Sequence, residues 1–145
     1  KKRVLVGIPA SADKRDDVEF GNAGIGYINE FGAPEMNIPP RPHLVPGVAA
    51  IKDKIVARLK AAGQDALEGR VQAADAQLEA VGQEAVNAVD TKIADGEFTP
   101  LAPATLAARR RYARKTGGHA VDKPLQLTGK YRNSITYVIR KKGGD

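Results

Sequence analysis

The sequence predicts an α+β fold in which a small, mostly antiparallel sheet is combined with two longer helices and one short basic helix. Three observations lead to this class: β-branched segments near both ends, two long amphipathic stretches in the middle, and an arginine-rich stretch after them. A chain of 145 residues has the usual length of one domain, so we expect a single domain over residues 1–145. Aromatic residues are only 5% of the chain and Trp is absent, so the core must be built from Val, Ile, Leu and Ala.

The first part of the chain is predicted to contain a strand, a polar loop and a short helix. Residues 3–8 are rich in β-branched side chains and end at Pro9, which is typical of a strand. Residues 10–22 are polar and charged, as in a solvated loop or a hairpin arm. Residues 23–31 place apolar side chains at helical spacing, and Gly32 ends that helix.

A proline-rich connector then leads to two long helices. Residues 34–46 contain five prolines, which remove backbone donors and disfavour helix, so we expect an extended, stiff and unpacked segment. Residues 47–67 and 71–93 place apolar side chains three and four positions apart, which predicts two amphipathic helices. Their apolar stripes are thin, so we expect this pair to need the sheet or a neighbouring subunit for stability.

The last part is predicted to contain the basic helix and a second strand. Residues 103–114 form that helix, since its first proline suits the first turn and glycines follow its end. Residues 124–129 are rich in turn formers, and the final glycine suits a positive φ. Residues 134–139 alternate and are β-branched, as in a strand, and residues 141–145 are expected to form a flexible tail.

The composition offers little for catalysis. The chain has no Cys, which excludes disulfides, thiolate chemistry and Cys-ligated metal centres. Its histidines, His43 and His119, form no metal-binding helix motif, and we expect both in loops or at the surface. The glycine-rich residues 21–26 match neither the Walker nor the dinucleotide fingerprint. We therefore expect no catalytic, cofactor-binding or metal-binding residues, no enzyme activity and, without an apolar run of about 18 residues, no membrane span.

The net charge of +6 is distributed unevenly along the chain. Residues 107–145 hold eleven basic and two acidic groups, a net charge of +9, while residues 1–106 hold 12 basic and 15 acidic groups, a net charge of −3. Such asymmetry indicates either contact with a polyanion or a bipolar subunit that packs its basic end against an acidic neighbour. Composition does not choose between the two.

A run of basic residues is the densest part of this charge and has two interpretations. Arg110 and Arg114 share a helix face, which suits the phosphates of a nucleic acid, and each contact releases counterions. The alternative is a solvated face or ion pairs with an acidic neighbouring subunit. Few aromatic residues interleave with the charges, so base stacking and sequence-specific recognition are not expected. The candidate DNA-facing or interface residues are Arg109, Arg110, Arg111, Arg114 and Lys115.

Several short motifs follow one another along the chain, and their order together is more informative than any one of them alone. They are Tyr27-Ile28-Asn29-Glu30-Phe31-Gly32, Ile38-Pro39-Pro40-Arg41-Pro42-His43-Leu44, Thr99-Pro100-Leu101-Ala102-Pro103-Ala104-Thr105-Leu106, Lys123-Pro124-Leu125, Leu127-Thr128-Gly129, and Arg132-Asn133-Ser134-Ile135 with Tyr137. In this order, the chain resembles the virion morphogenesis proteins of tailed bacteriophages, the group that includes neck, head–tail joining and tail-completion proteins. The sequence departs from the usual pattern at Asn29, where the family often has His, at His43, where it often has an aromatic residue, and at Tyr131, where it usually has Leu.

The resemblance implies a structural virion protein that forms a homo-oligomeric ring at the neck or at the head-proximal end of the tail. A hexamer is favoured and a dodecamer beside the portal is the rival. The implied partners are tail tube proteins, head connector proteins or both, and genomic DNA in the channel. The implied location is the virion, and the host cytoplasm during assembly. No catalytic group or cofactor is implied.

The motif residues also suit an interface. A proline-stiffened strip loses little entropy when it is held against a neighbour, and the Arg41 guanidinium within it suits bidentate pairing with a carboxylate. The alternative for this strip is ordinary loop architecture. The interface candidates are Tyr27, Glu30, Phe31, Arg41 and Pro42. The alternative function for the whole chain is a non-specific nucleic-acid-binding protein that uses its basic C-terminal third.

Overall fold

The computed structural model describes residues 1–17, 19–126, 129–141 and 143. In chain order the elements are β1 (Lys2–Gly7), α1 (Ala10–Asp13), α2 (Asn22–Phe31), the 3-10 helix η1 (Pro34–Met36), α3 (Leu44–Ala49), α4 (Lys52–Leu67), α5 (Val71–Asp95), α6 (Pro103–Thr116), α7 (Lys130–Ser134) and β2 (Thr136–Lys141). The fold is the expected α+β combination of a small antiparallel sheet with helices.

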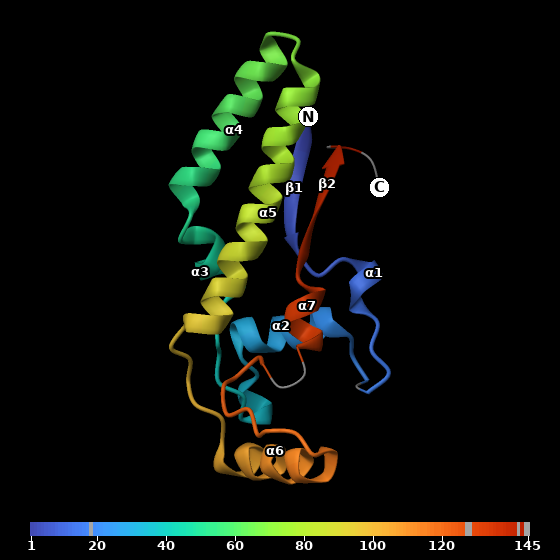
Figure 1. Cartoon of the computed structure of the whole chain (residues 1–145), viewed down its shortest axis with the longest axis vertical. Helices are drawn as coiled ribbons and strands as arrows, with labels where there is room; N and C mark the ends of the chain where they lie inside the picture. Colours follow the sequence, from blue (N-terminus) through green and yellow to red (C-terminus); the bar gives the residue numbers. More distant parts are fainter. Residues whose placement is uncertain (18, 127–128, 142, 144–145) are drawn as a thin grey trace.

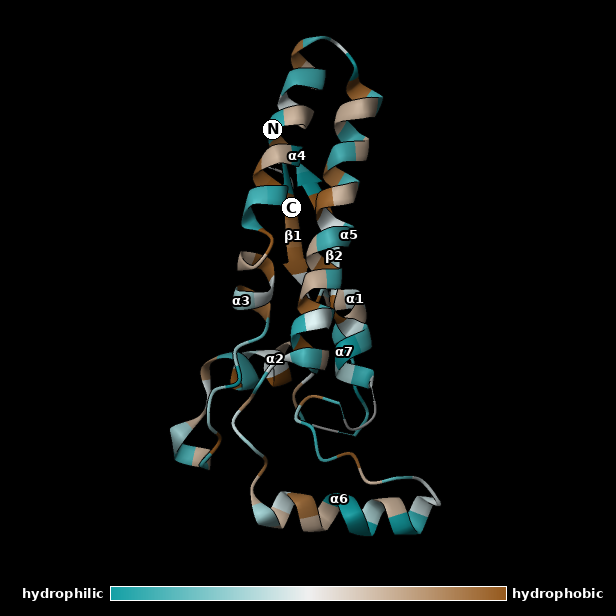
Figure 2. Ribbon diagram, turned by 60° about the vertical axis from the view of Figure 1, so that its left-hand side comes forward, coloured by the Kyte–Doolittle hydropathy of each residue, from teal (hydrophilic) through white to brown (hydrophobic). Residues whose placement is uncertain are grey.

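The molecule is elongated, as Figure 1 shows. The hairpin of α4 and α5 runs along the long axis, and the ribbon of β1 and β2 lies beside α5. The short helices α1, α2 and α7 gather near the middle, below the ribbon. Helix α6 lies across the long axis at the end opposite the α4–α5 turn. Figure 2, a second view, also shows α6 separated from the other helices.

The two strands pair in antiparallel register, with Lys2 opposite Lys141 and Val6 opposite Tyr137. Because side chains alternate along a strand, every second pair faces α5. On that face the ring of Tyr137 packs against Gly82 so closely that a Cβ at Gly82 would overlap it. The glycine therefore sets how near the ribbon comes to the helix.

The helical hairpin confirms the two amphipathic patterns, with one interruption. α5 extends over the predicted stretch and two residues further, but the predicted helix 47–67 is divided between α3 and α4. The division lies at Ile51, whose φ of −114° and ψ of 22° leave the helical region. Just before the division, Gly47 of α3 lies against Val89 of α5, where a Cβ would come within 2.9 Å of the Val89 Cα atom.

The prediction of an extended, unpacked connector over residues 34–46 is wrong. Ala33 and Ile38 exchange backbone hydrogen bonds of 2.9 and 3.0 Å around η1, and the Arg41 N–H donates to the carbonyl of Asn29 at 2.6 Å. Prolines remove donors only at their own positions, so the residues between them remain able to bond. The connector is consequently folded against α2.

The other local predictions have mixed outcomes. The strand at residues 3–8, the helix at residues 23–31 and its end at Gly32 are confirmed within one residue. The polar loop 10–22 contains the one-turn helix α1, which the sequence did not indicate.

In the C-terminal third too, some predictions are confirmed and others are corrected. The basic helix extends two residues beyond its predicted end, and Gly117 closes it with a φ of 71°. Gly129 also has a positive φ, as predicted, and it precedes α7, a helix that the sequence did not indicate. The strand predicted at residues 134–139 is β2, but it begins two residues later than predicted because Ser134 belongs to α7. Of the predicted tail 141–145, Lys141 belongs to β2, and residues 142, 144 and 145 lie outside the described residues, as do residues 127–128.

A small core forms where α5, α7 and the neighbouring short elements meet. Val89 and Ile93 of α5 are fully buried, and they pack with Tyr131 and Ile135. Partly buried aliphatic side chains from α2, α3, the loop before α7 and Ile8, directly after β1, surround this cluster. The core thus lies in the middle of the molecule, and the outer part of the hairpin and all of α6 lie beyond it.

Candidate functional site

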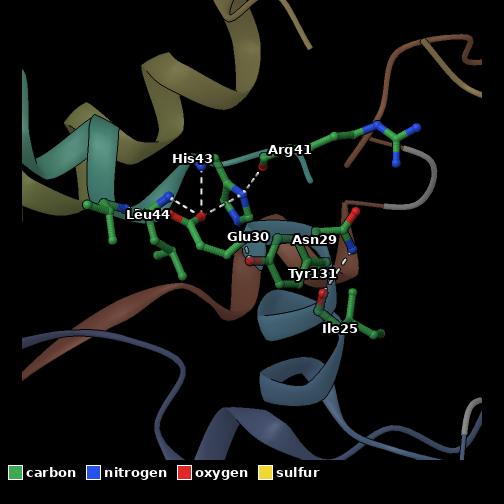
Figure 3. Close-up of polar contacts among 8 residues, drawn as sticks. Ile25, Asn29, Glu30, Arg41, His43, Leu44 and Tyr131 are labelled. Carbon is green, nitrogen blue, oxygen red and sulfur yellow. Dashed lines mark hydrogen bonds and ion pairs between the residues drawn. The ribbon is translucent and has the colours of Figure 1, made fainter. Parts of the chain in front are cut away.

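A buried set of polar side chains joins α2, the connector and α7, and we call Glu30, Arg41, His43 and Tyr131 the polar junction. The Glu30 carboxylate accepts hydrogen bonds from the backbone N–H groups of His43, Leu44 and Val45 at 2.8, 2.9 and 3.0 Å (Figure 3). These groups begin α3 and have no helical acceptor, and a negative charge is favourable at that end of a helix. Glu30 therefore fixes the start of α3 from a different element.

His43 lies at the centre of the junction, in the loop directly before α3, as one of the two predicted settings had it. The other predicted setting, the surface, is wrong, because His43 is 0% exposed. Its Nδ1 donates to the Arg41 carbonyl at 2.8 Å, so its Nε2 is the acceptor for the Tyr131 hydroxyl at 2.5 Å. Burial lowers the pKa of His43, against the opposing effects of the Arg41 carbonyl and of Glu30. Burial and the Glu30 charge raise the pKa of Tyr131. Both groups are therefore held neutral, as a hydrogen-bonded pair.

Arg41 connects the first set of motifs to the second. Its Nε donates to the Thr99 carbonyl at 2.8 Å and its Nη2 to the Pro100 carbonyl at 3.0 Å, and the residue is 6% exposed. Burial lowers its pKa. The expectation of an exposed fork that pairs with a neighbour's carboxylate is not met, because the fork is already bound to carbonyls of the same chain.

The interface candidates thus divide into two groups. Glu30 and Arg41 are buried and make internal hydrogen bonds, whereas Tyr27, Phe31 and Pro42 are at the surface. Tyr27 is 66% exposed and Phe31 is 61% exposed, and their ring centroids are 4.9 Å apart on one face of α2. The rings present apolar area to solvent directly beside the junction.

Two further exposed residues near the connector were missed by sequence reasoning. Met36 of η1 is 53% exposed and Val45 of α3 is 65% exposed. Both are apolar residues within the proline-rich stretch 34–46. Because this stretch has no helical or strand periodicity, the sequence gives no face on which they would be buried, and that is the signal that could have found them. We call Tyr27, Phe31, Met36 and Val45 the exposed apolar set.

The basic run of α6 is also divided. Arg109 is half-buried, and its Nη1 donates to the carbonyls of Val121 and Lys123 at 2.7 and 2.8 Å. Burial and the charge of Arg41 lower the pKa of Arg109, with Asp122 acting in the opposite direction. The other four candidates of the run are exposed: Arg110, Arg111, Arg114 and Lys115.

The surface as a whole is large for this chain. The accessible area is 9623 Å², whereas a compact monomer of 15.4 kDa exposes roughly 7,200 Å². Part of the additional area is apolar, and on the hairpin Leu67 is 91% exposed and Val71 61% exposed at the turn. Exposed apolar area of this kind marks contact surfaces.

Within the described ranges, no three His, Asp or Glu side chains gather as they would around a metal ion. No helix in the described part of the chain has the length and apolar character of a membrane span. His119 is exposed, as predicted.

Comparison of the chain with protein-family models, with curated proteins and with solved structures finds no match.

Proposed function

We propose that this chain is a structural virion protein of a tailed bacteriophage, which forms a closed ring at the neck or at the head-proximal end of the tail. Its work is binding: it joins the tail to the head connector, or it caps the tube and so completes the tail. The order of the motifs supports this proposal. So do the contacts between them, because Glu30 and Arg41 of the early motifs fix α3 and the segment that leads into α6.

The observation that carries the proposal is the area that the monomer leaves uncovered. The excess over a compact monomer is about 2,400 Å², comparable to what a subunit buries on the two sides where it meets its neighbours in a ring. Contacts between unlike faces close into a ring when the rotation between copies permits it. The exposed apolar set lies on rigid elements beside the polar junction, which suits such a contact.

The proposal is tested by the mass of the purified chain in native mass spectrometry. We expect a discrete oligomer, with six copies favoured and twelve as the rival. Changing Tyr27 and Phe31 together to Ser removes the ring pair and should shift the mass to the monomer. The matched control is Lys60→Ser, an exposed polar residue of α4, which should leave the oligomer intact. A wild-type chain that stays monomeric at every concentration would contradict the proposal.

The position in the particle is tested with phage that lack this protein. Separate full heads and finished tails would favour a joining role, and overlong tail tubes would favour a terminator. Complete, infectious virions from the deletion strain would remove the proposed function altogether.

A second candidate function, non-specific nucleic-acid binding, is favoured by one observation. Helix α6 has no acidic residue and exposes four basic side chains at the far end of the molecule. Each phosphate contact should contribute about −0.9 to the slope of log affinity against log salt on duplex DNA.

The test of this second function changes Arg110, Arg111 and Arg114 to Ala and leaves Arg109, which holds the loop after α6. Loss of salt-dependent DNA binding with an intact oligomer would support nucleic-acid binding. Loss of the oligomer would instead make the basic helix a subunit contact.

A further inference from the structure

A cavity of about 510 Å³ lies between α6, α2 and α7. Its wall includes the cationic side chains of Arg15, Arg109 and Lys130, the phenol of Tyr112, and the aliphatic side chains of Leu101 and Leu125. It is a recess with apolar walls and several hydrogen-bond donors. That combination is typical of a site for one charged group on an apolar stem.

One edge of the Arg109 guanidinium has hydrogen-bond donors that no described residue accepts. The two Nη1 hydrogens are directed to the carbonyls of Val121 and Lys123. The Nε and Nη2 groups have no acceptor among the described residues. These two groups form the parallel fork that a carboxylate meets side-on. Tyr112, 53% exposed in the same wall, can donate a further hydrogen bond from its hydroxyl.

The positive charge around this cavity exceeds the negative charge. Arg109 and the neighbouring Arg41 have no carboxylate within salt-bridge distance among the described residues, and both guanidinium groups are bound to carbonyls. Arg15 donates to Asp17 at 2.8 Å, and Lys130 lies 3.9 Å from the same carboxylate. Asp17 and the more distant Asp122 are therefore the carboxylates that oppose the charges of Arg15, Arg41, Arg109 and Lys130 among the described residues. A half-buried charge without a counter-charge is unfavourable, so binding of an anion in this cavity is electrostatically favourable.

We propose that this cavity binds an acidic side chain, Asp or Glu, from a neighbouring protein subunit. The aliphatic wall suits the methylene stem of such a side chain, and the open fork of Arg109 suits its planar carboxylate. The phosphates of a duplex would meet the exposed residues of α6 before they reached a half-buried arginine in a recess. This inference rests on the proposed function in one respect, because the acidic side chain is supplied by the adjacent subunit of the ring.

The test follows the arginine Nε–Hε resonances of the full chain by NMR during a titration with glutarate, a carboxylate on a short aliphatic stem. We expect a saturable shift of the Arg109 resonance with a millimolar dissociation constant, which sodium chloride of equal ionic strength does not reproduce. In Arg109→Lys, which keeps the charge and loses the fork, the Tyr112 amide should report at least tenfold weaker binding. Arg110→Gln, an exposed neighbour on the same helix, should bind like the wild type.

Three outcomes would overturn the inference. The first is the absence of a saturable shift with glutarate. The second is an equal shift with sodium chloride, which would show screening alone. The third is saturation by inorganic phosphate without saturation by glutarate, which would assign the cavity to phosphate groups.

Sedimentation of the same samples separates this inference from the proposed function. If the wild-type chain is strictly monomeric but its Arg109 resonance shifts saturably, the ring is contradicted and the anion site is supported. In a stable ring the neighbouring subunit already fills the cavity, so the titration is then made on the Tyr27→Ser, Phe31→Ser monomer. An Arg109 resonance that does not respond in that monomer would remove the anion site and keep the ring.

Discussion

The polar junction and helix α6 contain the same kinds of charged residue but place them in opposite environments. At the junction, Glu30 and Arg41 are 5% and 6% exposed, and both charged groups are hydrogen-bonded within the chain. On α6, Arg110 and Arg111 are exposed and form no hydrogen bond or ion pair with another described residue. The comparison shows that the buried charges of the junction serve the fold, whereas the exposed charges of α6 are available to a partner.

The largest loss of stability is expected when the carboxylate of Glu30 is removed from the polar junction. Glu30→Ala removes the acceptor for three backbone N–H groups, and hydrogen bonds to a charged group contribute about 1.5–3 kcal/mol each. We expect the free energy of unfolding, measured in urea, to fall by at least about 3 kcal/mol. The control is Glu35→Ala on η1, an exposed residue, whose stability should equal that of the wild type. Equal losses in both variants would show that Glu30 does not hold α3.

Two glycines of the hairpin offer a matched pair of packing variants. A Cβ at Gly82 would overlap the Tyr137 ring, so Gly82→Ala should cost about 1–3 kcal/mol as the ribbon is pushed away. A Cβ at Gly63 meets nothing within 4 Å, so Gly63→Ala should stabilise by about 0.5–1 kcal/mol through helix propensity. Thermal unfolding of both variants gives the comparison. Stabilisation by Gly82→Ala would mean that the ribbon does not pack on α5.

His43 and Tyr131 are two of the three residues that depart from the motif pattern the sequence resembles, and a direct hydrogen bond joins them. His43→Phe and Tyr131→Leu, made singly, each leave a buried polar group without its partner, at about 1–3 kcal/mol. The double variant restores an apolar contact, so its loss should be smaller than the sum of the single losses by about 1 kcal/mol or more. A double-mutant cycle in urea measures this difference, and strict additivity would contradict the coupling.

The junction should also make stability depend on pH. The pKa of His43 is lowered in the folded state, so the unfolded chain binds the proton more readily. Stability is therefore fully present above the unfolded pKa of about 6.5 and falls as the pH decreases towards the folded pKa. One such group gives a slope of at most about 1.4 kcal/mol per pH unit. Urea unfolding at pH 7.5 and 5.5 should show the loss, which His43→Phe should reduce and the exposed His119→Gln should not.

The smallest effect is expected on α6. Changing Arg110, Arg111 and Arg114 to Ala should alter the free energy of unfolding by no more than about 0.5 kcal/mol, since these side chains are exposed. A loss above about 1 kcal/mol in urea would show that the charges of α6 support the fold after all.

The elements that could be predicted from the sequence are those with long periodic patterns. The strands, α2, α5 and α6 depend on spacing within one segment, and the structure places them within about two residues of the prediction. The break at Ile51 and the helix α7 were missed because neither has a local signal. The helical spacing of apolar residues continues through Ile51, and α7 is only five residues long.

The polar junction could not be predicted for the same reason. His43 and Tyr131 are 88 residues apart, and no local pattern distinguishes a buried histidine from one at the surface. Arg41 was predicted to pair with a carboxylate of a neighbour, but its acceptors are the carbonyls of Thr99 and Pro100 in its own chain. Burial of these residues follows from the way distant segments meet, which the sequence does not display.

The pairing of Lys2 with Lys141 has a kinetic consequence. The ribbon joins two strands that lie more than a hundred residues apart in the sequence, so β1 is synthesised long before its partner β2. The long loop between the strands gives their pairing a high entropy of closure, so we expect this contact to form late in folding. Until then, one apolar strand edge remains open, and it is the segment a chaperone or a second nascent chain would meet.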